Sequence, residues 1–287
     1  MISLIVATRG RVEEIGLLLD SLLEGQRAAF EVILVDQNDD ARLDPLLARY
    51  AGRLPLTHLR MERANANAGR NLGLRHARGD IVAFPDDDCV LPPGVLARVR
   101  LAFDSDGSLA VLTGPAAAPG GGLGSGRWNT ERGPITLENV WTSVIEFNLW
   151  LRREAALRLG GFDEAMGPGA RFGSAEGNDL VCRALAAGLH ARYAPELRVV
   201  HPDKRLTREA ARRAGRYGLG LGFALRRHGA PLRLRLAFLY RPLGGALLAL
   251  LRLNLLHAWY YLATFQGRLR GMLARPLPWP APLEPVA

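Results

Sequence analysis

The chain has 287 residues, of which 48% are hydrophobic and 23% are charged, and it carries a formal net charge of +9. This composition excludes a disordered or fibrous protein and predicts a globular chain with a large buried core. The two cysteines, Cys89 and Cys182, are too few for a disulfide framework or a cysteine metal site, and we expect both in the core.

The charge is unevenly distributed along the chain. Residues 1–202 contain 22 basic and 25 acidic side chains, a net charge of −3, whereas residues 203–287 contain 15 and 3, a net charge of +12. A basic segment of this kind can bind nucleic acid or anionic lipid. The apolar runs within it favour an anionic membrane surface, and we expect no nucleic acid partner.

The first part of the chain alternates predicted strands and helices. Short apolar runs predict strands at residues 3–7, 30–35, 56–61 and 81–84, and apolar residues at helical spacing predict helices at 12–23, 43–50 and 69–77. Such alternation is typical of βαβ units. It predicts an α/β domain whose mostly parallel sheet is flanked by helices.

The middle of the chain is rich in glycine. We expect residues 115–133 to form a mobile loop, and the absence of a GK[ST] sequence argues against a phosphate loop there. Residues 140–151 are apolar and predict a strand or a helix, and a short helix is expected at 153–159. A second glycine-rich loop then leads into a helix at 176–187.

The sequence after residue 202 changes character. Arginine-rich helical sequence is followed by apolar runs at 243–251 and 253–265, each shorter than the roughly 20 residues that a spanning helix needs. Trp259, Tyr260 and Tyr261 among leucines, with arginines on either side, predict a pair of helices lying in the membrane interface. A soluble helical cap and a spanning hairpin are the alternatives.

Three consecutive aspartates occur in the stretch AFPDDDCVLPP, at the end of the strand predicted at 81–84. Adjacent carboxylates are costly there unless solvent, hydrogen-bond donors or a cation compensates them. A solvated turn before Pro92 and Pro93 would satisfy them as well. Because ligands of open α/β sheets bind at the carboxyl ends of strands, a cation site is the more informative hypothesis.

Four motifs in order carry a family resemblance: SLIVATRGR, EVILVDQND, NAGRNLGLRHARGDIVAFPDDD, and FGSAEGNDLVCRAL followed by VVHP. The set resembles the family 2 glycosyltransferases with the GT-A fold, of the type found in bacterial polysaccharide biosynthesis. The resemblance covers residues 1–202 and implies a GT-A nucleotide-sugar glycosyltransferase domain there. Residues 203–287 would then form a basic and apolar helical extension at the membrane.

The resemblance implies roles for several polar residues toward a nucleotide-sugar donor. Thr8 and Asp36 would contact the base and ribose, Arg70 would lie near the diphosphate, and Asp86 and Asp87 would lie toward the nucleoside. Carboxylates accept hydrogen bonds from base N–H and ribose hydroxyl groups, and guanidinium groups suit phosphate oxygens. Taken alone, Asp36 also fits a turn cap and Arg70 a solvated helix face.

The resemblance also implies a divalent cation. Asp88, the last acid of a DxD-type motif, would be the main metal ligand, and His201 would complete the shell or contact the diphosphate. Oxygen ligands suit Mg²⁺ or Mn²⁺, and an imidazole nitrogen is acceptable to Mn²⁺. The cation would neutralise the departing nucleoside diphosphate.

The sequence departs from the family where the catalytic base is expected. Many relatives carry Glu-Asp-x-Asp, whereas this chain reads Glu176-Gly177-Asn178-Asp179, so that glycine occupies the usual base position. Either Glu176 or Asp179 has taken over the role, or turnover is weak or absent. We favour Glu176 at the loop-to-helix junction, although both acids also suit the N-terminus of a helix.

Two tryptophans are candidates for stacking on an acceptor sugar. Trp128 lies in the glycine-rich segment 115–133, and Trp150 lies in the apolar segment 140–151. Burial in the core is the more common use of such residues.

The sequence therefore predicts an inverting, metal-dependent hexosyltransferase-like enzyme that moves a sugar from a nucleotide donor to a lipid-linked or polysaccharide acceptor for the cell envelope. The first residues lack the features of a signal peptide, so we expect a cytoplasmic protein, peripheral at the inner face of the cell membrane. A nucleotidyltransferase is disfavoured because no phosphate loop follows the first strand. A non-catalytic, membrane-associated partner that keeps the fold and binds nucleotide is the alternative that Gly177 favours.

Overall fold

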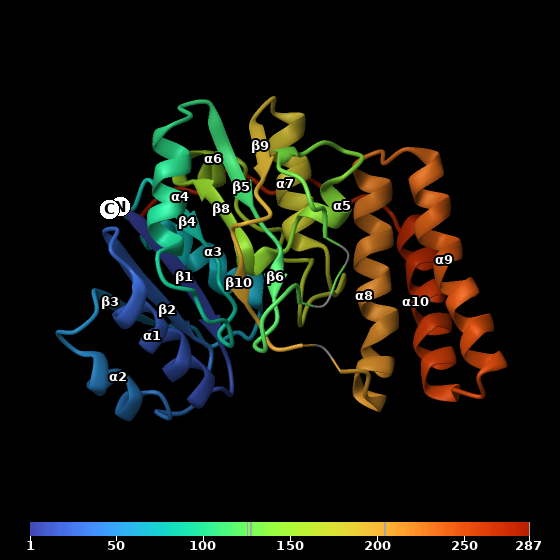
Figure 1. Cartoon of the computed structure of the whole chain (residues 1–287), viewed down its shortest axis with the longest axis horizontal. Helices are drawn as coiled ribbons and strands as arrows, with labels where there is room; N and C mark the ends of the chain where they lie inside the picture. The colour runs from blue at the N-terminus through green and yellow to red at the C-terminus, as the bar shows by residue number, and fades with distance from the viewer. Residues whose placement is uncertain (125, 127, 204, 287) are drawn as a thin grey trace.

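The computed structural model describes residues 1–124, 126, 128–203 and 205–286. Figure 1 shows a central sheet with helices on both faces and a group of three C-terminal helices beside it. The strands are β1 (Ile2–Thr8), β2 (Phe30–Asp36), β3 (Leu56–Arg60), β4 (Ile81–Ala83), β5 (Leu109–Thr113), β6 (Ala116–Ala117), β7 (Gly133–Pro134), β8 (Leu149–Arg152), β9 (His190–Tyr193) and β10 (Val199–Val200).

The helices follow the strands along the chain. They are α1 (Glu13–Gly25), α2 (Asp44–Tyr50), α3 (Ala66–His76), α4 (Val95–Asp104), α5 (Val140–Ser143), the 3₁₀ turn η1 (Glu146–Asn148), α6 (Arg153–Arg158), α7 (Glu176–Ala186), α8 (Arg208–Arg227), α9 (Leu232–Leu251) and α10 (Leu255–Leu273). Helix α3 begins three residues before the predicted start, because the Asn65 side chain accepts a hydrogen bond from the Ala68 amide and caps it.

The main sheet has eight strands in the order β3-β2-β1-β4-β8-β5-β9-β7. Strands β1 to β4 are mutually parallel, β8 runs antiparallel to β4 and β5, and β9 is again parallel to β5. The predicted α/β architecture with a mostly parallel sheet is confirmed. The segment 140–151 is neither one strand nor one helix, since it divides into α5, η1 and β8.

The glycine-rich segment 115–133 is more ordered at its ends than predicted. Strand β6 pairs with β10, β7 pairs with β9, and Ala117 forms a bridge with Leu123. The prediction of a mobile loop also covers residues 125 and 127, which lie outside the described residues.

Two apolar cores cover the two faces of the sheet. In β1, Leu4 and Val6 pack toward α1 and α4, whereas Ile5 packs on the opposite face, and all three side chains are fully buried. Alternation along the strand therefore fills both cores, which explains why β1 is an uninterrupted apolar run. Both cysteines are buried, as expected.

The parallel strands bring their carboxyl ends to one edge of the sheet. Thr8 at the end of β1 pairs in register with Asp36 at the end of β2. Strand β4 lies next to β1 and ends at Ala83, so the three aspartates follow at the same edge. The topology thus gathers polar residues from distant parts of the sequence.

The C-terminal helices stand beside the sheet (Figure 1), and α8 contributes fully buried side chains to its core. Phe223 and Leu225 of α8 are buried in the same cluster as Leu180 of α7. Helices α8 and α10 approach closely because glycines face each other, and a Cβ added to Gly218 would lie 2.6 Å from the Thr264 carbonyl oxygen.

Helix α9 is longer than the apolar run at 243–251 that it contains. It starts at Leu232 and continues through Arg233, Arg235 and Arg241 to Leu251, a length of 20 residues. Among the described residues it is the one helix long and apolar enough to cross a membrane by length and composition. The short apolar run at 243–251 is therefore part of a helix of spanning length, which starts at Leu232.

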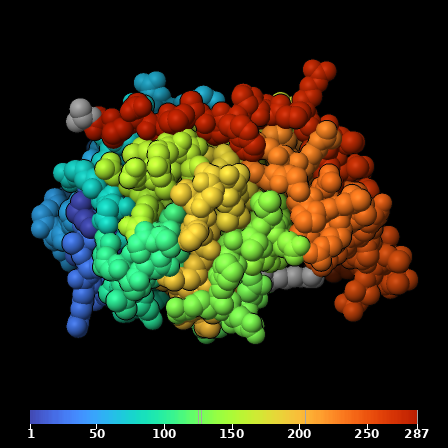
Figure 2. Space-filling view, turned by 90° about the horizontal axis from the view of Figure 1, so that it is seen from above, coloured from blue at the N-terminus to red at the C-terminus, as the bar shows by residue number. Residues whose placement is uncertain are grey.

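The C-terminal tail returns across the sheet domain. Figure 2 shows it running over one face of the molecule toward the N-terminal half. The Leu283 amide donates to the Leu157 carbonyl oxygen at 2.9 Å, and the Val286 amide donates to the Arg75 carbonyl oxygen at 2.8 Å. These contacts tie the end of the chain to α3 and α6.

Two glycine substitutions test the packing of α8 against α10. Gly218→Ala is expected to destabilise the protein by about 1–3 kcal/mol, because the new methyl group would overlap the backbone of α10. Gly244→Ala is the matched control in α9, where a Cβ would meet open space, and it should stabilise the protein by about 0.5–1 kcal/mol. Urea unfolding measures both, and equal effects of the two substitutions would contradict the packing described.

Candidate active site

The centre of the site is a cluster of two aspartates and a histidine. Asp86, Asp88 and His201 each offer a ligand atom within 4.8 Å of the others. The His201 Nε2 atom lies 3.3 Å from Asp88 Oδ1 and 3.9 Å from Asp86 Oδ2. The imidazole is held in place by stacking on the Phe147 ring, with centroids 4.6 Å apart and planes 13° apart.

The middle aspartate is held by the end of β1. The Thr8 hydroxyl donates to Asp87 Oδ2 at 2.7 Å, and Arg11 Nη1 donates to Asp87 Oδ1 at 2.6 Å. Burial raises the pKa of Asp87, as do the charges of Asp86 and Asp88, while these two donors oppose the shift. Arg11 also lies 2.6 Å from Asp88, so one guanidinium compensates two of the three acids.

Arg70 connects the aspartates to α7. This side chain is 5% exposed, and its Nη2 atom donates to Asp86 Oδ1 at 2.7 Å. Its Nη1 atom donates to Asn67 Oδ1 at 3.0 Å and lies 3.5 Å from Glu176 Oε1. The guanidinium predicted to lie near a diphosphate is therefore placed between two acids at the centre of the site rather than on a solvated helix face.

Glu176 is a buried acid at the start of α7. The residue is 1% exposed, and its Oε2 atom has no hydrogen-bond partner among the described residues. Burial raises its pKa to about 8, the charge of Glu146 adds to the shift, and Arg70 opposes it. At neutral pH this carboxyl group carries its proton, which makes it a poor proton acceptor in this state.

Asp36 is also buried. Its Oδ1 atom accepts hydrogen bonds from the amide and the side chain of Asn38, and its Oδ2 atom lies 3.1 Å from His58 Nε2. These contacts form the turn cap that the sequence offers as the local alternative for this residue. The carboxylate nevertheless lies at the same sheet edge as Thr8.

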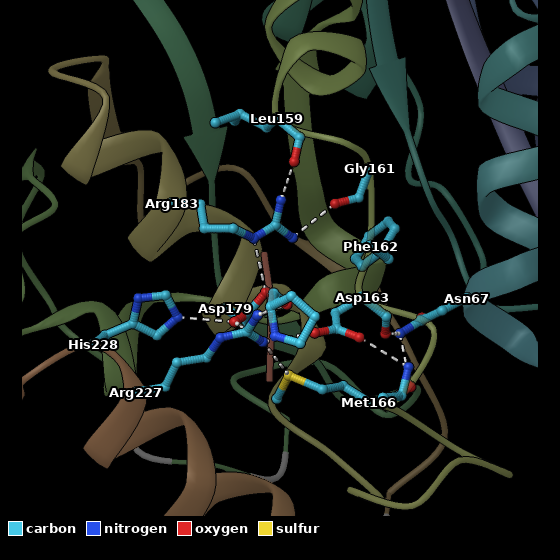
Figure 3. A network of polar contacts seen from close by, with 12 residues as sticks. Asn67, Leu159, Gly161, Phe162, Asp163, Met166, Asp179, Arg183, Arg227 and His228 are labelled. Carbon is cyan, nitrogen blue, oxygen red and sulfur yellow. Dashed lines mark hydrogen bonds and ion pairs between the residues drawn. The ribbon is translucent and has the colours of Figure 1, made fainter. Parts of the chain in front are cut away.

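Asp179 lies apart from the cluster, in the network shown in Figure 3. It is fully buried, its Oδ2 atom accepts from Arg183 at 2.9 Å, and its Oδ1 atom accepts from Arg227 at 3.2 Å and contacts His228 at 2.8 Å. Three cationic or potentially cationic groups therefore occupy its carboxylate. Asp179 therefore joins α7 to the end of α8.

The two tryptophans differ in their surroundings. Trp150 is 1% exposed and its indole N–H donates to Asn148 at 2.9 Å, so it belongs to the core and offers no stacking surface. Trp128 is partly buried, and its indole N–H donates to the Gly124 carbonyl oxygen. The prediction of core burial is thus confirmed for Trp150.

The site contains residues that the sequence did not single out. Arg11 follows β1 within the first motif, and its position close to a strand end was the available signal. Asn67 and Phe147 had no comparable signal, because their partners lie far away along the chain.

The donor set fits a divalent cation. The Asp88 Oδ1 atom is buried without a hydrogen-bond partner in the described structure, and it faces both Asp86 and His201. An orphaned carboxylate oxygen in such a place calls for a compensating positive charge. Two carboxylates and an imidazole suit Mn²⁺, and the carboxylates also suit Mg²⁺.

Comparison with known proteins identifies the family. The sequence model of the family described as Glycosyl transferase family 2 matches residues 3–159, more than half of the chain. The chain belongs to glycosyltransferase family 2.

An uncharacterised glycosyltransferase of Haemophilus influenzae is 36% identical over 117 residues, 40% of this chain and 39% of that protein. The uncharacterised glycosyltransferase YwdF of Bacillus subtilis is 28% identical over 99 residues, 34% and 36% of the two chains. The matches thus span less than two fifths of the length of these curated relatives.

Solved structures show the same fold. S. aureus TarS residues 1–349 in complex with UDP-GlcNAc has a TM-score of 0.60 at 18% identity, covering 94% of this chain and 91% of that one. The mannosyltransferase PcManGT from Pyrobaculum calidifontis in complex with GDP-Man and Mn²⁺ has a TM-score of 0.62 at 20% identity, covering 93% and 86%. This glycosyltransferase therefore has the predicted GT-A fold.

The buried carboxyl group of Glu176 predicts a pH dependence of stability in this glycosyltransferase. The folded state keeps the proton to about pH 8, whereas the unfolded chain loses it near the ordinary value of 4.5. The folded state binds more protons between these values, so the wild type loses stability as pH rises through them. Glu176→Gln has no proton to lose, and its stability relative to the wild type should increase with pH.

Urea unfolding at pH 5, 7 and 8.5 measures this difference. We expect the advantage of Glu176→Gln to grow by at least about 1.4 kcal/mol from pH 5 to pH 8.5, the free energy of one pKa unit. An advantage that stays constant over this range would show that the carboxyl group is ionised at pH 5 already.

Proposed function

We propose that this glycosyltransferase is an inverting, metal-dependent enzyme that moves a hexosyl group from a nucleotide sugar to a lipid-linked or polysaccharide acceptor. The observation that carries the proposal is the cluster of Asp86, Asp88 and His201 at the carboxyl edge of the sheet, in which the buried Asp88 Oδ1 atom has no hydrogen bond. The TarS and PcManGT structures contain UDP-GlcNAc and GDP-Man. These likenesses support a nucleoside diphosphate sugar as the donor.

Different residues at the edge of the sheet would contact different parts of the donor. Thr8 and Asp36 lie in register at the ends of neighbouring strands, where they would face the base and ribose. Asp86 and Asp87 come next along the same edge and would face the nucleoside. Arg70 is held at 2.7 Å from Asp86 and would turn toward the diphosphate, whose charge is larger than that of one carboxylate.

Asp88 and His201, with Asp86 beside them, would hold the cation. When bound, Mn²⁺ or Mg²⁺ would supply positive charge at the diphosphate and so favour its departure. The protein residues keep this position dry and fixed: Asp88 has an 11% exposed side chain, and the His201 ring is stacked on Phe147. Single displacement at the anomeric carbon inverts its configuration, so an α-linked donor would give a β-linked product.

Titration calorimetry with UDP, GDP and dTDP, each with and without Mn²⁺, tests the donor site. We expect one nucleotide to bind in a Mn²⁺-dependent manner and Asp88→Ala to weaken that binding at least about tenfold, since a ligand of the cation is lost. Asp104→Ala is the matched control, because this acid is exposed at the end of α4 and pairs with Arg100.

The outcomes separate the two readings of the protein. Binding of none of the three nucleotides would contradict the proposal, and equal affinity in Asp88→Ala would contradict the metal site. Nucleotide binding without any metal-dependent hydrolysis of the corresponding nucleotide sugars would favour a non-catalytic partner.

The C-terminal helices support an acceptor at the membrane surface. We propose that residues 203–287 form the membrane-associated extension of a catalytic domain at 1–202, at the cytoplasmic face of the cell membrane. Exposed apolar side chains gather at the turn between α9 and α10, where Leu253 is 87% exposed and Leu255 is 72% exposed. Trp259, in the first turns of α10, is also exposed, and the exposed Arg252 lies beside the turn.

Sedimentation with lipid vesicles tests this extension. We expect binding to vesicles that contain phosphatidylglycerol, weaker binding to phosphatidylcholine alone, and a decrease with added salt. Leu253→Asn combined with Leu255→Gln should reduce the fraction bound at least about fivefold, because buried apolar area drives interfacial binding. Residue 253 has a φ of 54°, in the left-handed region of the backbone, and asparagine is chosen there because it adopts this conformation more readily than most side chains.

Leu17→Gln is the control, since Leu17 is 61% exposed on α1, far along the chain from the proposed surface. Equal vesicle binding by the wild type, the double variant and this control would contradict the placement of the membrane surface.

A further inference from the structure

Gly177 at the start of α7 packs directly against η1. Gly177 stands where many relatives carry an acid, and a Cβ built on it would lie 3.3 Å from the Cα and the Cβ atoms of Glu146. The Glu146 backbone nitrogen would be 3.4 Å away. A side chain at 177 would therefore press on the backbone of residue 146, and the glycine allows η1 to pack closely against the start of α7.

Glu146 lies on η1, a turn that is firmly anchored on its C-terminal side. Asn148 is fully buried, and its side-chain amide donates to the Pro115 carbonyl oxygen at 3.0 Å and to the Leu197 carbonyl oxygen at 2.7 Å. Trp150 donates to the same side chain at 2.9 Å. The backbone that carries Glu146 is thereby fixed in position.

The same turn reaches both parts of the site. Phe147, the next residue, stacks on His201 of the aspartate cluster. On the other side, the Asn178 side chain donates to the Val140 carbonyl oxygen at 2.9 Å and ties the start of α7 to α5. Glu146 is thus held between the proposed cation site and the N-terminus of α7.

The other acids of this region are buried and already lie against basic side chains. Asp179 is fully buried among Arg183, Arg227 and His228, and Glu176 is 1% exposed beside Arg70. Glu146 is partly exposed, and its carboxylate forms no hydrogen bond or ion pair with the residues that the structure describes. Its charge contributes to the raised pKa of both Glu176 and Arg70, which places it near both groups.

We propose that Glu146 is the general base of the transfer reaction, in place of the acid that is absent at Gly177. The proposal rests on the transferase function proposed above. The Glu146 carboxylate accepts the proton of the acceptor hydroxyl while the acceptor oxygen bonds to the anomeric carbon of the donor. The bond from that carbon to the diphosphate oxygen breaks, and the nucleoside diphosphate leaves with the electron pair. Glu146 then releases the proton to water.

This assignment replaces Glu176 in the role that the sequence favoured for it. Glu176 keeps its proton at neutral pH, is 1% exposed and lies 3.5 Å from the buried guanidinium of Arg70. An uncommitted and partly exposed carboxylate is the better proton acceptor.

Two measurements on the full chain test the proposal. The first is the release of nucleoside diphosphate from UDP-N-acetylglucosamine and GDP-mannose with Mn²⁺, with water as the acceptor. The second is calorimetric binding of UDP and GDP with Mn²⁺. Glu146→Gln should lower the release rate at least about 100-fold, the typical contribution of a general base, and leave nucleotide affinity within about twofold. Glu154→Gln, on the exposed surface of α6, is the matched control that should retain both.

A second pair of variants tests the position itself. Glu146→Ala should lose the same activity, and Glu146→Ala combined with Gly177→Asp should recover at least about tenfold of it, because the new carboxylate would stand on α7 next to the position of the one removed. The Cβ of the new aspartate would lie 3.3 Å from the Cα and Cβ atoms of residue 146, so η1 has to shift slightly to accept it. A merely structural role for Glu146 predicts no recovery.

The outcomes distinguish the two proposals. A wild type that binds neither nucleotide and releases none overturns the transferase function and this inference with it. A wild type that binds and releases nucleotide, while Glu146→Gln keeps the wild-type rate, overturns the role of Glu146 alone. A loss of nucleotide affinity equal to the loss of rate would also overturn it, because Glu146 would then be part of the donor site.

Discussion

Three adjacent carboxylates at the end of a buried strand repel one another, and the surrounding structure is organised to compensate them. The donors come from three separate segments: Thr8 and Arg11 from the end of β1, Arg70 from α3, and His201 from the segment after β10. The end of β1 lies beside the aspartates because β1 and β4 are neighbouring parallel strands, whereas α3 and the segment after β10 bring Arg70 and His201 to the same edge. The compensation remains incomplete at Asp88 Oδ1, which is buried without a hydrogen bond and has the His201 Nε2 atom at 3.3 Å, and this carboxylate is the physical basis for expecting a cation.

The C-terminal helices are bound to the sheet domain through a second set of charges, apart from the aspartate cluster. Arg227 and His228, at the end of α8, meet Asp179 of α7 in the network of Figure 3, and Arg227 also pairs with Asp163 at 2.6 Å. Buried carboxylates with several cationic partners fix the orientation of the elements that carry them. The proposed membrane surface of α9 and α10 therefore has a defined position relative to the start of α7, where Glu146 and Glu176 lie. An acceptor presented at that surface would meet the site in a constant geometry.

Local sequence predicts the βαβ half of the fold well, because periodicity and strand-end acids are properties of neighbouring residues. Strands β1 to β4 and helices α1 to α3 follow the predicted segments within a few residues. The sequence predicts less where long-range contacts decide the outcome. The reversed strand β8 forms only because β4 and β5 flank it, and Trp150 becomes core for the same reason. Asp36, Arg70 and the three aspartates were found from their motifs, whereas Glu146 carries no motif. Its proximity to Gly177 is visible only in three dimensions.

The central claim is that the aspartate cluster holds a divalent cation against the diphosphate of a nucleotide. Anomalous X-ray diffraction at the manganese absorption edge, on crystals grown with Mn²⁺ and UDP or GDP, tests it most directly. The account predicts one strong anomalous peak within coordination distance of Asp88, with Asp86 and His201 beside it and the two phosphates of the nucleotide adjoining. Bound nucleotide with no manganese at Asp88, or manganese bound elsewhere on the chain only, would contradict it.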